Sequence, residues 1–181
     1  MKLLVRKGGL FVKLFKPAMP YLAWLMVLLL TSASLAYAAP PSRPFKATME
    51  MTVVGQGRME KCPVITPGIH GGGQLLSGTG HATHLGTVQA GGSHCADLRQ
   101  QVNFYFFNGE MTLTATNGDL VHSDYSGFLT LVSAGVYSFE GNYFIKGGTG
   151  RFQDASGTGA LFGTGDFSTN LTLTAEGRIS Y

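Results

Sequence analysis

Beyond residue 38, the sequence has no apolar run long enough to span a bilayer and no apolar stripe with helical spacing that lasts three turns. A repeat of about 3.6 residues marks an amphipathic helix, so this absence argues against a helical domain. Charged residues are also few, at 13% of the chain. Intrinsic disorder is nevertheless excluded, because 44% of the residues are hydrophobic and 11% are aromatic, and one compact domain is expected.

The positive charge of the chain lies mostly at its start. Residues 1–16 contain five basic residues and no acidic ones, whereas eight basic and ten acidic residues follow from Ala39 onward, a net charge of −2. A basic surface for phosphates is therefore missing, and we expect no nucleic-acid partner. Signatures of a Ser-His-Asp triad, a paired-carboxylate hydrolase and a Walker-type phosphate loop are also missing, so no cofactor is expected.

Residues 1–38 have the organisation of an export signal. The basic start leads into an apolar run over residues 21–30, and Ala36-Tyr37-Ala38 matches the small-residue pattern that signal peptidase cleaves. We therefore predict a signal helix cleaved after Ala38 and a mature protein in the periplasm or outside the cell, with no stable membrane insertion. The alternative is an uncleaved anchor, because apolar character extends from Pro17 to Ala38.

A Pro-rich segment, residues 39–44, follows the signal. Proline cannot join a central strand, so we predict that this segment is a flexible leader. Residues 45–181 are long enough to bury a sizeable core, and they are predicted to form one barrel domain.

This domain alternates between apolar and polar residues with a period of two, clearly so in residues 45–53, 111–116, 136–145 and 171–176. Such alternation is typical of half-buried antiparallel strands. Asn108-Gly109 predicts a hairpin turn, and residues 117–119 predict another. We expect an all-β fold with eight or nine antiparallel strands. A single closed, calycin-like barrel after the signal helix is favoured, because closure removes the edge strands.

Residues 102–107 are apolar or aromatic on both faces of the predicted strand, with Val102, Phe104 and Phe106 on one side and Tyr105 and Phe107 on the other. A strand of this kind is usually covered on both sides. The outer cover is either an additional loop or the leader, or else it is a subunit interface or a ligand surface.

Glycines concentrate in residues 145–163, where no helix follows that would suit phosphate binding, so they indicate bulges and barrel corners. The sequence Gly147-Gly148-Thr149-Gly150-Arg151-Phe152 resembles the glycine-rich motif of the allene oxide cyclase and dirigent superfamily. Residues 80–86, 117–120 and 177–181 resemble exported bacterial proteins of the same barrel type. The resemblance implies an eight-stranded barrel with an apolar cavity, often trimeric, whose plant members cyclise an epoxide or steer radical coupling. It supplies no catalytic residue for this chain.

Cys62 and Cys95 are the only cysteines. An even count in an exported protein favours a disulfide, which would close a loop of about 34 residues and add roughly 3–4 kcal/mol of stability. Two free buried thiols are the alternative.

The histidines do not predict a metal site. His81 and His84 are three residues apart, and on a straight strand this spacing sends their side chains to opposite faces. His94 beside Cys95 could form a nucleophile pair, but a disulfide would consume the sulfur. His84 suits a hydrogen-bonded structural role.

Arg151 lies among carboxylates in the second half of the chain, and two interpretations remain open. Arg151 and an aspartate form a structural pair at a glycine-rich corner, or Arg151 or Asp124 lies with Tyr143 at the mouth of a cavity. The candidate ligand-binding residues are His84, Tyr105, Asp124, Tyr143 and Arg151.

Three functions follow from these observations. The leading one is binding of a small apolar or amphipathic molecule in or on the barrel. A cyclase or isomerase that uses the cavity is an alternative, and it predicts a polar group with a perturbed pKa inside. An envelope or matrix protein that assembles through its outer face is the other alternative. It predicts a filled barrel and an aromatic patch around Tyr105 and Phe107.

Overall fold

The structure, a computed structural model, describes residues 40–66, 69–70, 72–97, 103–166 and 169–181. The expected signal helix and the cleavage site at Ala38 lie outside the described residues. Residues 40–181 form one compact unit. No helix in the described part of the chain is both long enough and apolar enough to cross a membrane.

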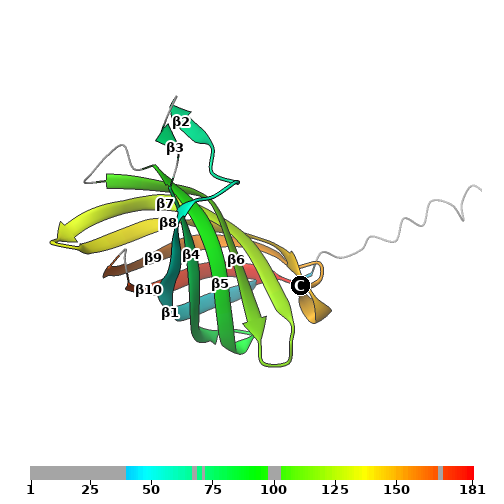
Figure 1. Cartoon of the computed structure of the whole chain (residues 1–181). Helices are drawn as coiled ribbons and strands as arrows, with labels where there is room; N and C mark the ends of the chain where they lie inside the picture. Colours follow the sequence, from blue (N-terminus) through cyan, green and yellow to red (C-terminus); the bar gives the residue numbers. More distant parts are fainter. Residues whose placement is uncertain (1–39, 67–68, 71, 98–102, 167–168) are drawn as a thin grey trace, which may run out of the picture. The chain divides into compact units, whose positions relative to one another are not determined.

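Eight antiparallel strands close into one barrel, which confirms the fold class that the alternation predicted (Figure 1). Around the barrel the order is β1-β10-β9-β8-β7-β6-β5-β4, and β4 pairs with β1 to close the ring. The barrel strands are β1 (Arg43–Arg58), β4 (Gly72–Ala82), β5 (Gly86–Asp97), β6 (Asn103–Ala115), β7 (Leu120–Ser133), β8 (Val136–Gly148), β9 (Ser156–Asp166) and β10 (Asn170–Ser180). Between β1 and β4 the chain forms a separate two-stranded sheet of β2 (Val64–Thr66) and β3 (Ile69–His70).

The first strand begins at Arg43, inside the segment expected to be a flexible leader. Arg43 and Pro44 pair with Ile179 and Arg178 of β10, whereas the pairing of β1 with β4 begins only at Ala47. The backbone of Pro44 therefore faces a side without a neighbouring strand, where its missing N–H breaks no ladder. Its carbonyl accepts a hydrogen bond from His84 Nε2 at 2.9 Å.

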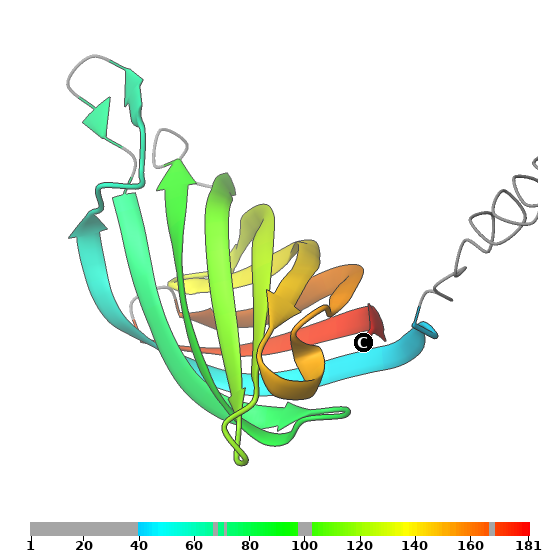
Figure 2. The ribbon, with the colours of Figure 1, turned by 90° about the vertical axis from the view of Figure 1, so that its right-hand side faces the viewer.

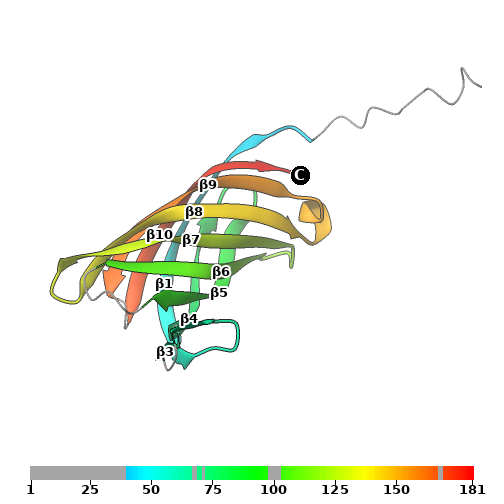
Figure 3. The same ribbon diagram turned by 90° about the horizontal axis from the view of Figure 1, so that it is seen from above.

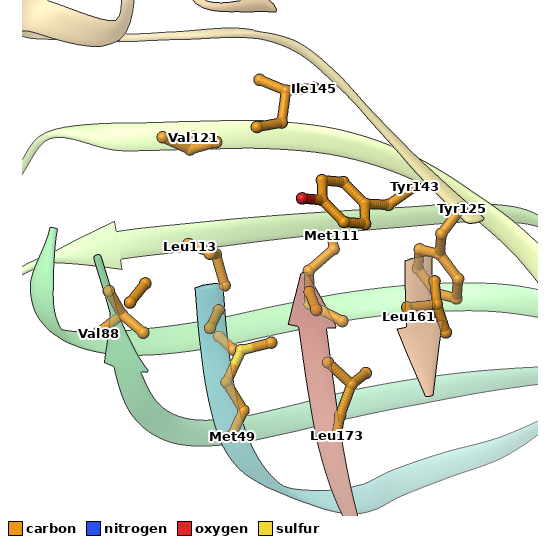
Figure 4. Packing of buried hydrophobic residues seen from close by; sticks show 14 of the residues in the cluster. Met49, Val88, Met111, Leu113, Val121, Tyr125, Tyr143, Ile145, Leu161 and Leu173 are labelled. Carbon is orange, nitrogen blue, oxygen red and sulfur yellow. The ribbon is translucent and has the colours of Figure 1, made fainter. Parts of the chain in front are cut away.

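Alternate residues of every barrel strand point inward and form the core (Figure 4). In β1 the buried residues are Phe45, Ala47, Met49 and Met51, and the lysine, threonine and glutamate residues between them are exposed. The period of two that was visible in the sequence is therefore the division between the barrel interior and solvent.

The hairpin predicted at Asn108-Gly109 was wrong. Residues 103–115 form one continuous strand, β6, whose pairing with β7 shifts register between Phe106 and Gly109. Asn108 has a φ of 48°, so it adopts the left-handed conformation that Asn tolerates within a bulge as well as in a turn. The turn predicted at residues 117–119 is confirmed, and Gly118 has a φ of 87° there.

Candidate functional site

The five predicted ligand-binding residues lie in three separate places. His84 and Arg151 lie at one end of the barrel, Tyr105 and Asp124 lie on its outer face, and Tyr143 lies inside. The predicted group of Arg151 or Asp124 with Tyr143 at a cavity mouth is not formed. In the register of β7 and β8, Tyr125 pairs with Tyr143 and Asp124 pairs with Phe144, so Asp124 and Tyr143 point to opposite faces.

His84 and Arg151 belong to a cap over one end of the barrel, where the 3₁₀ turn η1 (Gly150–Phe152) and the C-terminus meet (Figure 2). Arg151 donates a hydrogen bond to the carbonyl oxygen of His84, and its Nε lies 3.5 Å from Asp119 Oδ2. Phe152 is fully buried against Tyr181, with ring centroids 4.7 Å apart. These contacts fit the structural interpretation of Arg151, a pair with aspartate at a glycine-rich corner.

The side chain of His84 makes a hydrogen bond and a ring contact within the same cap. Its backbone has a φ of 71°, in the tight connection between β4 and β5. Its ring packs on Tyr181 at 5.7 Å, and its Nε2 donates to the Pro44 carbonyl. This connection therefore ties the start of β1 to the C-terminus.

Asp124 is also paired. Lys146 Nζ lies 2.7 Å from Asp124 Oδ2 on the solvent side of β7 and β8, and this hydrogen bond raises the pKa of Lys146. A surface pair of this kind contributes little to stability.

Tyr143 faces a small cavity inside the barrel. The cavity has a volume of about 40 Å³, and Met49, Met111 and Leu113 are among its apolar walls. Tyr143 is only 4% exposed, and its hydroxyl has no hydrogen-bond partner among the described residues. Figure 4 shows this hydroxyl, in red, among apolar side chains. Burial raises the pKa of Tyr143 to about 12.

A second cavity, of about 30 Å³, contains a polar pair that the sequence analysis did not find. His94 is 5% exposed and its Nδ1 shares a hydrogen bond of 2.9 Å with the Tyr125 hydroxyl. Burial, with a smaller effect from Lys61, lowers the pKa of His94 to about 4. Burial, with the nearby Glu110, raises the pKa of Tyr125. Only the three-dimensional register brings His94 and Tyr125 together, because they lie 31 residues apart in the chain.

The two cavities are too small for a typical ligand. Pockets for small molecules usually occupy about 300–1,000 Å³. Tyr125, Leu161 and Leu173 line both cavities, and the inward side chains of the described strands form one hydrophobic cluster around them. Within the described residues, these two cavities are therefore small gaps in an apolar core.

The predicted disulfide is confirmed between Cys62 and Cys95, with Cα atoms 5.4 Å apart. It anchors the segment after β1 to β5. The neighbouring Lys61 strengthens this junction, because its Nζ donates to the carbonyl oxygens of Ser93 and Asn108 and lies 3.0 Å from Glu110 Oε2. Because the sulfur atoms are joined, His94 has no free thiol beside it.

Strands β6 to β9 lie side by side in the barrel wall (Figure 3), and their outer face carries exposed aromatic side chains. Tyr105 is 41% exposed, Phe128 57% and Phe162 41%. In the strand register Tyr105 pairs with Phe128, Phe128 with Glu140, and Glu140 with Phe162, so these four residues form one row across the strands. Phe107 stacks on Tyr105 with ring centroids 5.6 Å apart. We call Tyr105, Phe128, Glu140 and Phe162 the aromatic row.

A groove of about 830 Å³ lies beside the aromatic row. Small side chains, those of Ser126, Asn142 and Ala160, form its floor and pair with one another across β7, β8 and β9. Within the described part of the chain, the side chains of Ser126, Asn142 and Glu140 make no hydrogen bond. The groove therefore combines exposed rings with unused hydrogen-bonding groups.

Only part of this groove was visible in the sequence. Tyr105 was identified from the two-faced segment, and a period of two also places residues 126, 128, 140, 142, 160 and 162 on outward positions of their strands. The missing information was the register, which brings residues from β6, β7, β8 and β9 together.

No family model matches this chain, and no curated protein matches it. No group of three or more His, Cys, Asp or Glu side chains suited to holding a metal ion occurs among the described residues. The function is therefore argued from the geometry of the interior and of the outer face.

Proposed function

We propose that this chain is an exported β-barrel that binds a small amphipathic molecule in the groove on the outer face of β6–β9. The observation that carries the proposal is the groove itself, in which three exposed rings line a floor of small residues with unpaired polar side chains. Exposed apolar patches of this kind often mark binding sites.

The relative size of the two candidate sites supports the outer face. A small interior void with an outer aromatic patch is also the pattern expected of the envelope or matrix alternative, in which another protein surface covers the same face. The interior voids measure about 40 and 30 Å³, whereas the groove measures about 830 Å³. A ligand inside would have to displace core side chains such as Met49 and Met111, and overfilling a packed core costs roughly 1–3 kcal/mol. A ligand in the groove displaces only water.

Export is part of the proposal. The disulfide is compatible with an oxidising compartment, and the small residues at positions 36 and 38 match the pattern that signal peptidase cleaves. Mass spectrometry of the full gene product, recovered from the exported fraction, should find a chain that begins at Ala39. A chain that begins at Met1 would instead support the anchor.

The second candidate function is the cyclase or isomerase suggested by the resemblance to allene oxide cyclases. It is favoured by the buried pair of His94 and Tyr125, since perturbed pKa values are common at active sites. Burial is the main cause of both shifts, however, and an active site at His94 needs more room than the 30 Å³ cavity offers. The outer groove therefore remains the proposed site.

A fluorescent probe separates the outer groove from the interior. N-phenyl-1-naphthylamine is a neutral amphipathic aromatic amine whose emission rises when it leaves water. We expect the exported protein to bind it, and the double variant Phe128→Ser/Phe162→Ser to bind at least about tenfold more weakly, the equivalent of 1.4 kcal/mol.

Ala175→Val is the matched interior variant, because Ala175 lines the larger cavity and the added methyl groups reduce its volume. We expect this variant to bind the probe like the wild type. The proposal fails if Ala175→Val abolishes binding while the double variant retains it, because that pattern places the probe inside the barrel.

A further inference from the structure

The groove restricts the chemistry of its occupant, because a carboxylate lies in the middle of the aromatic row. Glu140 pairs in register with Phe128 on one side and with Phe162 on the other. Its side chain is exposed and makes no ion pair or hydrogen bond with the described residues. Any occupant that covers the two rings also covers this charge.

An apolar partner fits this arrangement poorly. A lipid tail or the apolar face of a protein would remove water from Glu140 without supplying a hydrogen-bond donor, and burying an unpaired charge is costly. A second copy bound about a twofold axis through Glu140 would also bring two carboxylates together. The groove therefore suits an occupant with an apolar face and a rim of donors.

A pyranose sugar has both features. The axial C–H groups of one face of the ring pack on an aromatic side chain, whose π face is electron-rich. The equatorial hydroxyls around the rim donate to carboxylates and exchange hydrogen bonds with amide and hydroxyl groups. Phe128 and Phe162 offer the rings, and Glu140, Asn142 and Ser126 offer the polar partners.

We infer that the groove binds an extended oligosaccharide of β-linked pyranose units, with the sugar chain lying across the strands. This inference rests on the proposed function, because it names the class of amphipathic ligand that the same groove takes.

The dimensions of the groove agree with an extended sugar chain. Neighbouring strands are about 4.8 Å apart, so Ser126 on β7 and Ala160 on β9 are separated by about 10 Å. That span is about the length of a disaccharide unit in an extended β-linked chain. Phe128 and Phe162 lie two residues further along the same two strands and have the same separation. Each ring can therefore support one sugar unit, while Glu140 and Asn142 contact the hydroxyls between them.

A second outer groove shows which feature distinguishes the groove beside the aromatic row. It measures about 740 Å³ over β1, β4, β5 and β6 and is lined by hydroxyl and amide side chains such as Thr52, Thr79 and Gln89. None of the described residues that line it is aromatic, so this lining lacks the stacking surface that a sugar ring needs.

The test is calorimetric titration of the exported protein with cellohexaose and with chitohexaose. We expect binding of at least one of them, weakened about tenfold or more by Phe128→Ala and by Asn142→Ala. The control Val54→Ala removes an exposed apolar side chain from the other groove and should leave the affinity within about twofold. Circular dichroism confirms that each variant is folded.

Three results would overturn the inference. The first is that neither saccharide binds although N-phenyl-1-naphthylamine still requires Phe128 and Phe162, in which case the proposed function stands and the sugar class is wrong. The second is binding of choline with dependence on Glu140 but no saccharide binding, which indicates a cation site. The third is an oligomer that Phe128→Ala converts to a monomer, with no saccharide binding, which assigns the face to a second copy.

Discussion

The Tyr125 hydroxyl and His94 Nδ1 share a hydrogen bond of 2.9 Å inside the barrel. The other ring nitrogen of His94, Nε2, is buried and has no hydrogen-bond partner in the part of the chain that the structure describes. Burial and the positive charge of Lys61 both disfavour the charged form of the imidazole. The pair therefore stabilises the fold only while His94 is neutral.

This environment predicts a loss of stability in mild acid. The pKa of His94 is about 4 in the folded protein and 6.5 in an unfolded chain, so below pH 6.5 the unfolded state binds a proton that the folded state does not. The free energy of unfolding should fall as the pH drops from about 6.5 to 4, by roughly 3 kcal/mol from this group alone. Urea unfolding at several pH values measures it.

The variant His94→Gln isolates this contribution. It should be less stable than the wild type at pH 7, because the hydrogen bond to Tyr125 is altered, but it should lose less stability on acidification. His81→Gln is the control, since His81 is exposed on β4 and should leave the pH dependence unchanged. An equal acid dependence in His94→Gln and the wild type would show that His94 is not the responsible group.

The second prediction concerns the two buried tyrosines. The Tyr143 hydroxyl has no partner, so Tyr143→Phe should be neutral or stabilising by up to about 1 kcal/mol. Tyr125→Phe removes the partner of His94 Nδ1 and should cost about 1–3 kcal/mol. Denaturant unfolding of both variants compares them directly. A clear destabilisation by Tyr143→Phe would mean that the hydroxyl has a partner in solution, and would favour a ligand inside the barrel.

The all-β fold was predictable from the period of two, and a closed barrel was favoured because closure removes the edge strands. Each strand in residues 45–181 needs one covered face, and a barrel covers all of them without edges. Cys62 and Cys95 could be paired from sequence because no other cysteine competes. The Asn108-Gly109 bulge could not be predicted, since a left-handed Asn suits a turn and a bulge equally and only pairing with β7 decides between them.

The candidate site was less predictable, because the register between two strands cannot be read from the sequence of either strand alone. Asp124 and Tyr143 both have polar groups that could orient a ligand. Asp124, however, pairs with Phe144, the residue after Tyr143, so Asp124 and Tyr143 lie on opposite faces of the sheet. Phe128 and Phe162 are 34 residues apart and meet in one row only through Glu140. Tyr105 was identified because its own segment is apolar on both faces.

The third prediction concerns the disulfide. Replacing both cysteines by alanine, Cys62→Ala/Cys95→Ala, should lower the free energy of unfolding by about 2–5 kcal/mol, because the unfolded chain loses the constraint of the loop between them. Reduction of the wild type should give a similar loss. A double variant as stable as the oxidised wild type would mean that the surrounding contacts of Lys61 hold this junction without the bond.

The last prediction compares two glycines on different strands of the same barrel, one inside and one outside. Gly159 points inward on β9, where an added Cβ would press against the Glu176 carbonyl and lie 2.6 Å from the Tyr143 hydroxyl oxygen. Gly159→Ala should therefore destabilise the barrel by about 1–3 kcal/mol through overpacking.

Gly91 points outward on β5, with no atom within 4 Å of an added Cβ. Gly91→Ala should be neutral or stabilising by up to about 1 kcal/mol, because it reduces the freedom of the unfolded chain. Thermal and urea unfolding of the two variants provide the comparison. Equal stabilities of the two variants would show that the interior around Tyr143 can accept a methyl group. An interior that accommodates added atoms at so small a cost in stability would favour ligand binding inside the barrel.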